Sequence, residues 1–177
     1  MSLSKKIFIY IIFFYFFITN KIYAKYIFIS NENSDTVTVL DVESKKLIKS
    51  IETGGRPRDM KFNKEQSLLY VVVSEENHIA VIDINKLEII YYIDTGDDPE
   101  IFDIDPSGNI IAVSNEDDNE LTLIDIQTKK IIKTIEDVGV EPEGVNFSPD
   151  GKFVYVTSEG TNSVIIIDPW KHKIVNE

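Results

Sequence analysis

The sequence of 177 residues contains no cysteine, two histidines and one tryptophan. The lack of cysteine excludes disulfide bonds, iron–sulfur clusters, thiolate zinc sites, thiol catalysis and covalently attached haem c. Basic residues are also scarce, because 18 Lys and Arg stand against 30 Asp and Glu and leave a formal charge of −12. Nucleic-acid binding is therefore not expected, since affinity for a duplex depends on Lys and Arg that neutralise phosphates. The hydrophobic fraction of 43% nevertheless provides for a globular core.

One long apolar run stands near the N-terminus. Lys5 and Lys6 precede twelve apolar residues, 7–18, and Ala24 follows them. A spanning helix needs about 20 apolar residues, whereas a signal peptide needs a basic start, an apolar core of about 7–15 residues and a small residue at the cleavage site. Residues 1–24 are therefore predicted to be a signal peptide, with an uncleaved anchor as the alternative because Ile22 is large for a cleavage site. The remainder, 25–177, is expected to be periplasmic or secreted, with no membrane span after cleavage.

A repeat of about 42 residues organises the rest of the sequence. Asp41, Asp83, Asp125 and Asp168 each follow two apolar residues, at intervals of 42, 42 and 43. Each period contains four short runs of apolar, β-branched or aromatic residues, separated by Gly, Pro, Asn and Asp, which favour turns. After a first strand at 26–30, the predicted strands are 58–62, 69–74, 79–82, 87–93, 100–104, 110–114, 121–124, 130–135, 143–147, 153–157, 164–167 and one from 173 onward.

Four short strands per period predict an all-β fold, a β-propeller whose blades pack against their neighbours. The repeats span about 26–57, 58–99, 100–142 and 143–177, or about three and a half four-stranded blades. Because 26–30 aligns with the second strand of later repeats, the first blade is expected to lack its innermost strand. So few blades do not close a ring, and we therefore expect the chain to be incomplete, with self-assembly of two partial chains as the alternative.

Along 26–177 the sequence resembles the YVTN-type propeller repeat, and two runs of residues carry this resemblance. They are Tyr155-Val156-Thr157-Ser158 continuing to Ile166-Ile167-Asp168, and 141–152. The runs 56–58, 96–102, 114–119 and 140–144 resemble, more narrowly, exported propeller proteins associated with pyrroloquinoline quinone-dependent catabolism. The resemblance implies a seven-bladed protein, of which this chain is the N-terminal portion. It also implies a periplasmic accessory role beside quinone-dependent alcohol dehydrogenases and a transporter.

Acidic residues are concentrated in the loops expected at one face of the propeller. Glu100 and Glu143, with Arg58 at the equivalent position, begin the innermost strands and are expected near the mouth of the channel. The candidate face comprises Arg58, Asp97, Asp98, Glu100, Glu116, Asp117, Asp118 and Glu143. Three interpretations stay open: the acids keep an exported surface soluble, attract a basic protein partner, or hold a hard cation through carboxylate oxygens.

No catalytic, cofactor-binding or metal-binding residue is assigned, because the sequence contains no Gly-x-Ser-x-Gly elbow and no Gly-rich phosphate loop. The predicted function is a non-enzymatic binding or accessory propeller whose partner is a periplasmic redox or transport protein. The alternatives are a propeller enzyme, such as a lactonase-like hydrolase or a quinone-dependent dehydrogenase subunit, and a surface or adhesion repeat protein.

Several recurring residues are predicted to be structural. The four repeated Asp residues stand at strand ends and are expected to accept hydrogen bonds from turn amides. Asn115 and Asn119 are expected to form turns, and His78 and His172 to be exposed in loops. The aromatic residues in phase with the strands are expected in the core between blades; they are Phe62, Tyr70, Phe147, Phe153 and Tyr155.

Overall fold

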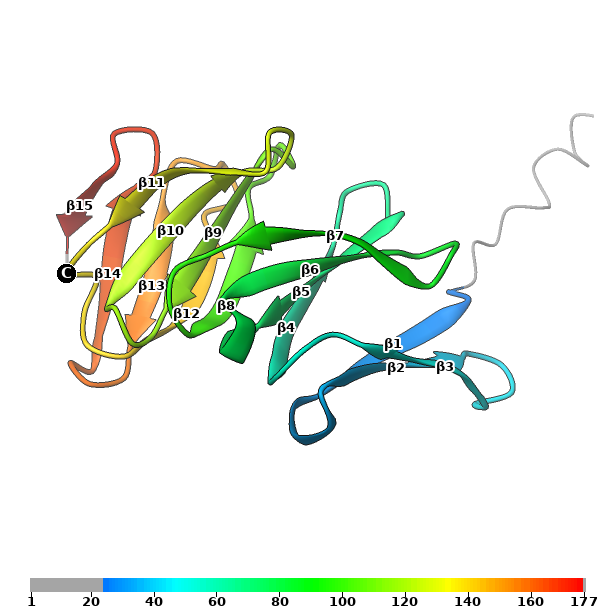
Figure 1. The fold of residues 1–177 in the computed structure, drawn as a ribbon. Coiled ribbons are helices and arrows are strands. Elements are labelled where there is room, and N and C mark those ends of the chain that lie inside the picture. The colour runs from blue at the N-terminus through cyan, green and yellow to red at the C-terminus, as the bar shows by residue number, and fades with distance from the viewer. Residues whose placement is uncertain (1–23, 177) are drawn as a thin grey trace, which may run out of the picture.

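The computed structural model describes residues 24–176 and contains fifteen β-strands and two short 3-10 helices (Figure 1). The predicted signal peptide therefore lies outside the described residues, apart from Ala24. Within the described part, no helix has the length and apolar character needed to cross a bilayer. The predicted all-β class is confirmed.

The strands form four antiparallel sheets that follow one another along the chain. The first sheet contains β1 (Tyr26–Asn31), β2 (Thr36–Asp41) and β3 (Leu47–Glu52), with the 3-10 helix η1 (Glu32–Ser34) between β1 and β2. The second contains β4 (Pro57–Phe62), β5 (Leu68–Val73), β6 (His78–Asp83) and β7 (Glu88–Asp94), with η2 (Ser74–Glu76) between β5 and β6. The third contains β8 (Pro99–Ile104), β9 (Ile110–Asn115), β10 (Glu120–Asp125) and β11 (Lys130–Ile135). The last contains β12 (Pro142–Phe147), β13 (Val154–Ser158), β14 (Ser163–Asp168) and β15 (Lys173–Asn176).

Each four-stranded sheet is a simple meander in which consecutive strands pair. In the first sheet β1 pairs with β2 as β5 pairs with β6, so among residues 24–176 this sheet has no counterpart of the innermost strands β4, β8 and β12. Within the described part of the chain, the expectation that the first blade lacks its innermost strand is thus confirmed. Figure 1 shows the sheets in succession, from the blue strands of the first sheet to the red strands of the last.

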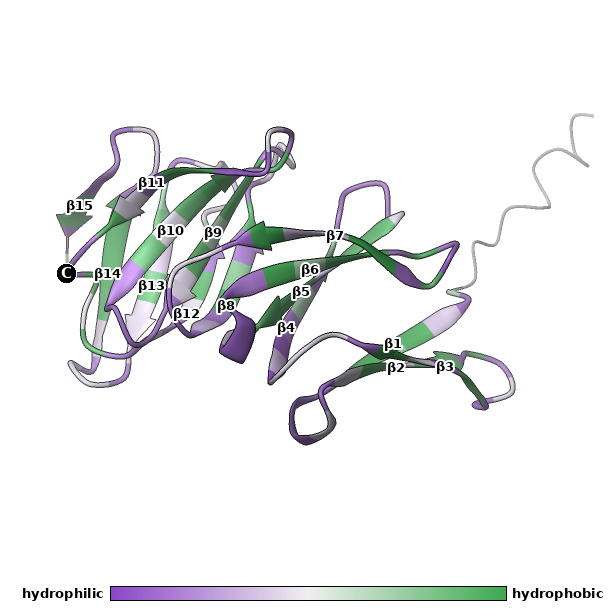
Figure 2. Cartoon of the chain, viewed as in Figure 1, coloured by the Kyte–Doolittle hydropathy of each residue, from purple (hydrophilic) through white to green (hydrophobic). Residues whose placement is uncertain are grey.

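The core lies between the sheets and consists of three clusters of buried side chains. Along β5, Val71 and Val73 point to the cluster shared with the first sheet, whereas Tyr70 and Val72 point to the cluster shared with the third sheet. Alternate residues of a strand face opposite sides, so a sheet covered on both sides needs a nearly continuous apolar strand. Figure 2 shows this pattern as hydrophobic strand centres between hydrophilic loops.

The four repeated Asp residues bind turn amides, as predicted. Asp41 Oδ1 accepts hydrogen bonds from the backbone N–H and the hydroxyl of Ser44, at 2.7 and 2.8 Å. Asp125 Oδ1 accepts the same pair of bonds from Thr128, at 2.6 and 2.7 Å. The corresponding bonds to Asp83 and Asp168 come from backbone N–H groups two and three residues later. These carboxylates are structural.

Expectations for four single residues were wrong. Asn115 is not a turn residue: it is the last residue of β9, is completely buried, and accepts a hydrogen bond from the backbone N–H of Gly96 at 3.2 Å. His78 is not an exposed loop residue: it begins β6, is half-buried, and its ring lies 4.5 Å from that of Tyr92.

Tyr155 and Phe62 are not core residues, because 38% and 46% of their surfaces are exposed. Tyr155 points away from the third sheet, and Phe62 contacts Phe28 of the first sheet, which has no innermost strand among the described residues. Tyr70 and Phe147 are buried in the core, as expected.

Asp105 anchors the turn between β8 and β9. The backbone N–H groups of Ser107, Asn109 and Ile110 donate to its carboxylate, the last two at 2.7 Å. We predict that Asp105→Ala lowers the free energy of unfolding by about 2 kcal/mol in urea denaturation, because three part-buried backbone hydrogen bonds lose their acceptor. Asp105→Asn should lower the free energy of unfolding much less. At the equivalent position of the preceding sheet, Asn63 Oδ1 accepts hydrogen bonds from the backbone N–H groups of Ser67 and Leu68. Equal losses in both variants would contradict this assignment.

Candidate functional site at the acidic end

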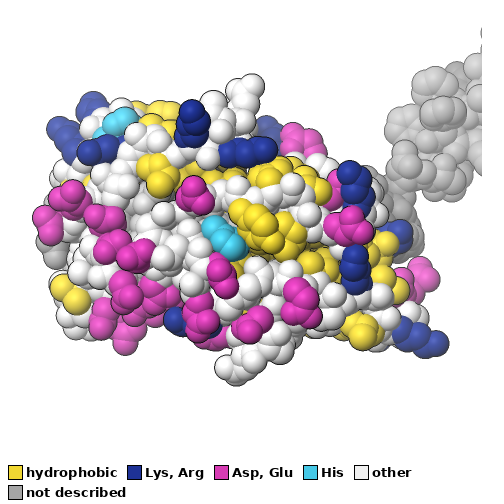
Figure 3. Space-filling view, in the orientation of Figure 1, with side chains coloured by type: hydrophobic (Ala, Val, Ile, Leu, Met, Phe, Trp, Pro, Cys, Tyr) yellow, Lys and Arg dark blue, Asp and Glu magenta, His cyan; other side chains and the backbone are white. Residues whose placement is uncertain are grey.

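Acidic side chains gather at one end of the sheets, which we call the acidic end. This end carries the loops after β1, β5, β9 and β13 and the connections β3–β4, β7–β8 and β11–β12. Its acidic residues are Glu32, Asp35, Glu75, Glu76, Asp97, Asp98, Glu116, Asp117, Asp118, Glu136, Asp137, Glu141 and Glu159, with Glu100 and Glu143 on innermost strands. In Figure 3, Asp and Glu gather along the lower left of the molecule, whereas Lys and Arg lie mostly along the upper edge and at the right.

A repeated backbone link positions the residues of the acidic end. In each connection, the residue before the proline that begins the innermost strand has a positive φ, of 57°, 48° and 52°. The N–H of that residue donates to a side-chain oxygen in the preceding loop, at 3.3, 3.1 and 3.0 Å. The donor and acceptor pairs are Arg56 with Asp35, Asp98 with Asn77, and Glu141 with Asn119. Asn119 is thus a turn residue, as predicted.

Glu100 is the centre of an ion-pair network. Its side chain on β8 is completely buried and pairs with Arg58 on β4 and, at 3.5 Å, with Arg56. Arg56 also reaches Asp98 at 3.4 Å and Glu32 at 3.3 Å. Arg58 contacts the same oxygen of Glu32 at 3.4 Å. The network therefore joins the loop of the first sheet to the second and third sheets.

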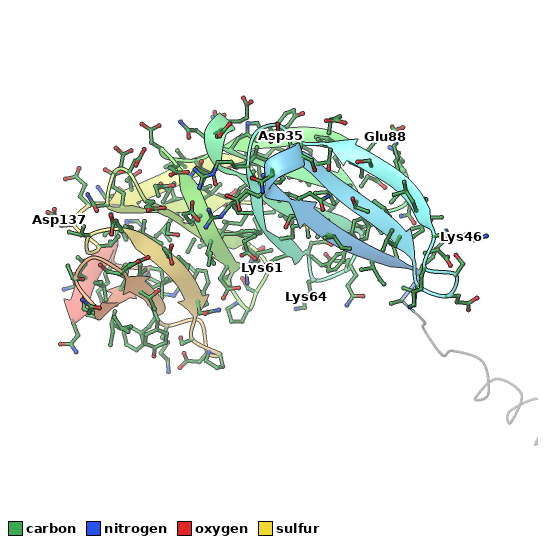
Figure 4. The ribbon with its side chains drawn as sticks, turned by 90° about the horizontal axis from the view of Figure 1, so that it is seen from below. Asp35, Lys46, Lys61, Lys64, Glu88 and Asp137 are labelled. Carbon is green, nitrogen blue, oxygen red and sulfur yellow. The ribbon has the colours of Figure 1, made fainter. Side chains whose placement is uncertain are left out.

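The innermost strands carry a second link between sheets. Lys61 on β4, labelled in Figure 4, lies 3.8 Å from Asp59 and 3.6 Å from Asp103 on β8. The backbone N–H of Phe102 donates to Asp59 at 3.3 Å, and that of Phe147 donates to Asp103 at 2.8 Å. Each of these carboxylates therefore binds the backbone of the next sheet and fixes the position of its innermost strand.

The carboxylates of the network are not equivalent electrostatically. Burial raises the pKa of Glu100 to about 7; Arg58 opposes this shift, while Asp98 and Glu116 add to it. Burial also raises the pKa of Glu116, and the charges of Asp98 and Glu143 add to the shift. A buried carboxyl beside other acids resists ionisation, and nearby guanidinium groups offset this in part.

One oxygen each from Asp98, Glu100 and Glu116 lies within 4.8 Å of the other two. Hard cations take such oxygen ligands. In this chain, however, Arg56 and Arg58 already bring two positive charges to Asp98 and Glu100. The geometry therefore favours an ion-pair network over a cation at this position.

The structure brings together four of the residues predicted for the site, namely Arg58, Asp98, Glu100 and Glu116. Glu143 is half-buried on β12, and its backbone oxygen accepts a hydrogen bond from Ser114 at 2.7 Å. Asp97 accepts a bond from Asn77 at 2.7 Å, and its N–H reaches Asp118 at 3.4 Å. Asp117 is exposed in the β9–β10 loop. Contrary to the expectation of an accessible acid, Glu100 is buried, because both arginines of the preceding sheet cover it.

Two members of the network, Arg56 and Glu32, stand in loops that were expected at this face but were not among the eight candidate residues. The signal for Arg56 was present, since it stands two residues before Arg58 in the same connection. A pocket of about 340 Å³ lies beside Arg58 and Glu32 and is also lined by Ser30, Pro57, Asp59 and Ile101. It adjoins the edge of β1 at which no strand of the described residues pairs.

Successive four-stranded meanders that pack face to face define a β-propeller, here a partial one. A family model described as YNCE-like beta-propeller matches residues 17–147, and the chain belongs to this family. A chain of Kuenenia stuttgartiensis hydrazine synthase is similar in structure, with 26% identity and a TM-score of 0.78. The match covers 86% of this chain and 45% of that one, so this chain spans less than half the length of that relative. None of the curated proteins matches the chain.

Proposed function

We propose that this chain is a non-enzymatic binding or accessory propeller whose acidic end docks a basic surface of a partner protein. The segregation of charge carries the proposal. Acidic loops of all four sheets meet at one end, and the two arginines there are engaged in ion pairs with Glu32, Asp98 and Glu100. A surface of one sign attracts a partner of the opposite sign and raises its rate of association.

We further propose that the partner is a periplasmic redox or transport protein of quinone-dependent alcohol catabolism. The four sequence runs that resemble the exported propellers of that system support this choice, because all of them fall at the acidic end. Their positions are 56–58, 96–102, 114–119 and 140–144, in or next to the loops described above. Export itself is proposed from the sequence of residues 1–24.

A second candidate is a propeller that forms part of an enzyme. One observation favours it, the similarity to a chain of hydrazine synthase. A cation held by the oxygens of Asp98, Glu100 and Glu116, which lie within 4.8 Å, has to displace the two arginines. In this case a cation at the acidic end, rather than a basic protein, is the expected ligand.

The test compares two variants with equal changes of charge. One variant carries Glu75→Gln, Asp117→Asn and Glu159→Gln, all exposed loop residues of the acidic end; the control carries Glu43→Gln, Glu65→Gln and Glu88→Gln, all exposed elsewhere. A basic cytochrome c serves as the probe, with association measured by surface plasmon resonance at about 50 mM salt. We expect the acidic-end variant to bind about tenfold more slowly than the unmodified chain, and the control to change less than twofold.

Equal losses in both variants, or no binding of the probe by the unmodified chain, would contradict docking at the acidic end. Binding of Ca²⁺ or Mg²⁺ without binding of the probe would favour the second candidate. The identity of the partner is tested separately, by affinity capture from a periplasmic extract. Recovery of a redox or transport protein is expected, and its absence would contradict the finer proposal.

A further inference from the structure

The outermost strand of each sheet contains a β-bulge at an equivalent position. In the second sheet Val81 pairs with Tyr91 and Ile82 with Ile89, which leaves Ile90 as the extra residue of β7. The register shifts at the same place in the other three sheets, where the extra residues are Ile48, Ile132 and Val175. A bulge re-aims the side chain of its extra residue. The repeat thus places an aliphatic side chain, 41% to 49% exposed, at the outer edge of every sheet.

These side chains are exposed at the edge itself and not on a sheet face that lacks a neighbour. The second and third sheets pack against a sheet on each side, yet Ile90 and Ile132 are 41% and 42% exposed. Bulges and charged residues protect an edge strand from pairing with other chains, but this protection does not require an aliphatic residue at the bulge. The repeated aliphatic residue therefore indicates contact with an apolar environment.

Lysines flank these bulges. In the third sheet Lys129 and Lys130 precede the exposed pair Ile131 and Ile132, and Lys133 follows it. The equivalent segments are 45–49, 86–90 and 171–175, and we call the four segments together the basic rim. The other lysines of the basic rim are Lys45, Lys46, Lys49, Lys86, Lys171 and Lys173. Its only acidic residue is Glu88.

The basic rim continues from sheet to sheet and lies opposite the acidic end. Lys49 lies 3.7 Å from Glu88 on β7, and the Lys129 ammonium lies 3.8 Å from the ring centroid of Tyr91 on β7. Each segment begins at the turn that leads into the outermost strand, whereas the acidic loops stand at the other end of the sheets. In Figure 1 β7 and β11 run along the upper side, where Figure 3 shows dark blue lysines beside yellow hydrophobic side chains.

We propose that the basic rim docks on the surface of a bilayer that contains anionic lipids. Lysines attract the anionic headgroups, and the aliphatic side chains beside them insert at the boundary between headgroups and acyl chains. Among the described residues, the ammonium groups of Lys130 and Lys133 form no ion pair, so both are available for this contact. Docking through the basic rim directs the acidic end away from the membrane and leaves it open to other proteins.

A bilayer fits the basic rim better than an acidic protein does. The four segments stand at the same end of the successive sheets, so one flat surface reaches several of them together. An acidic protein is attracted by the lysines alone and gives no role to the exposed aliphatic residues at the bulges. Apolar side chains beside lysines are the combination found in proteins that bind at a membrane interface.

The experiment measures the binding of residues 25–177 to lipid vesicles by sedimentation. This form contains all fifteen strands and the three core clusters, and it lacks the apolar run 7–18, which would itself insert into lipid. Vesicles of equal parts phosphatidylglycerol and phosphatidylcholine are compared with vesicles of phosphatidylcholine alone. At about 50 mM salt we expect a partition coefficient about tenfold higher on the anionic vesicles, and at about 500 mM salt most of this difference should disappear.

Two double variants with the same change of net charge test the lysines. Lys130→Gln with Lys133→Gln should lower the partition coefficient on anionic vesicles about tenfold. Asn33→Asp with Val140→Glu makes the net charge equally more negative, but at exposed positions of the acidic end, and should lower it less than about twofold. Circular dichroism checks that both variants are folded. Equal losses in the two variants would overturn the proposal, because they would show a response to net charge alone.

A pair of single variants tests the bulges. Ile132→Ser should lower the partition coefficient about fivefold, because it removes an inserted aliphatic side chain. Val140→Ser is the matched control: Val140 is 49% exposed, stands at the acidic end, and its loss should change the coefficient less than about twofold. Equal binding of the unmodified chain to both kinds of vesicle would overturn the proposal. So would full binding by Ile132→Ser, the result expected if the rim attracts anionic surfaces by charge without entering the bilayer.

Discussion

Phe102→Ala is expected to lower the free energy of unfolding by about 3–5 kcal/mol, the range found when a buried aromatic side chain is removed from a core. Phe102 on β8 is completely buried and belongs to the cluster between the second and third sheets, where it packs with Tyr70 and Ile111. Its removal leaves a cavity in the central of the three clusters, and close-packed β-sheets on either side prevent its collapse. Urea denaturation followed by circular dichroism measures the loss.

Phe62→Ala is the matched control for this prediction. Phe62 lies on β4 and is 46% exposed, with one edge-to-face contact to Phe28 at 5.9 Å between ring centroids. The same change of side chain should therefore cost about 1 kcal/mol, mostly through that aromatic contact. If Phe62→Ala destabilised the chain as much as Phe102→Ala, the packing of the sheets described above would be wrong.

The stability of the chain is expected to fall as the pH rises from 4 to 8, by about 3 kcal/mol through Glu100 alone. In the folded chain Glu100 has a pKa of about 7, whereas the ordinary pKa of a Glu side chain is 4.5. Between these values the folded state binds more protons than the unfolded state. Raising the pH through this window therefore favours the unfolded state, and lowering it restores stability.

Glu100→Gln should remove this part of the pH dependence, because the amide has no proton to lose. Free energies of unfolding at pH 4.5, 6 and 8 provide the measurement, and the difference between the two curves isolates Glu100 from the other acids. Glu143→Gln, at the equivalent position on β12, is half-buried and should leave the decline in place. A Glu100→Gln curve parallel to that of the unmodified chain would contradict the placement of Glu100 in a buried, desolvated position.

The succession of strands was predictable because it depends on local patterns. Alternating side chains and phased turn residues indicated thirteen of the fifteen strands, all but β2 and β3, and the alignment of 26–30 with the second strand of later repeats indicated the missing innermost strand. The repeated Asp residues were also predictable, since a carboxylate next to a tight turn binds amides two or three residues away. The hydrogen bonds of each repeated Asp therefore stay within its own loop, where the local sequence is enough to predict them.

The interior of the acidic end was not predictable in the same way. Glu100 is buried because Arg56 and Arg58 reach it from the preceding sheet, 44 and 42 residues earlier in the chain. No local pattern encodes that contact, because it depends on how successive sheets are placed side by side. The half-buried position of His78 against Tyr92 is a similar case, since it follows from the pairing of β6 with β7.

A crystal structure of the purified chain tests the central claim most directly. The account predicts four successive antiparallel sheets with the strand orders given above, and a Glu100 side chain enclosed by the guanidinium groups of Arg56 and Arg58 at the acidic end. Sheets whose order departs from the 42-residue period, or a Glu100 side chain that points into solvent away from both arginines, would contradict it.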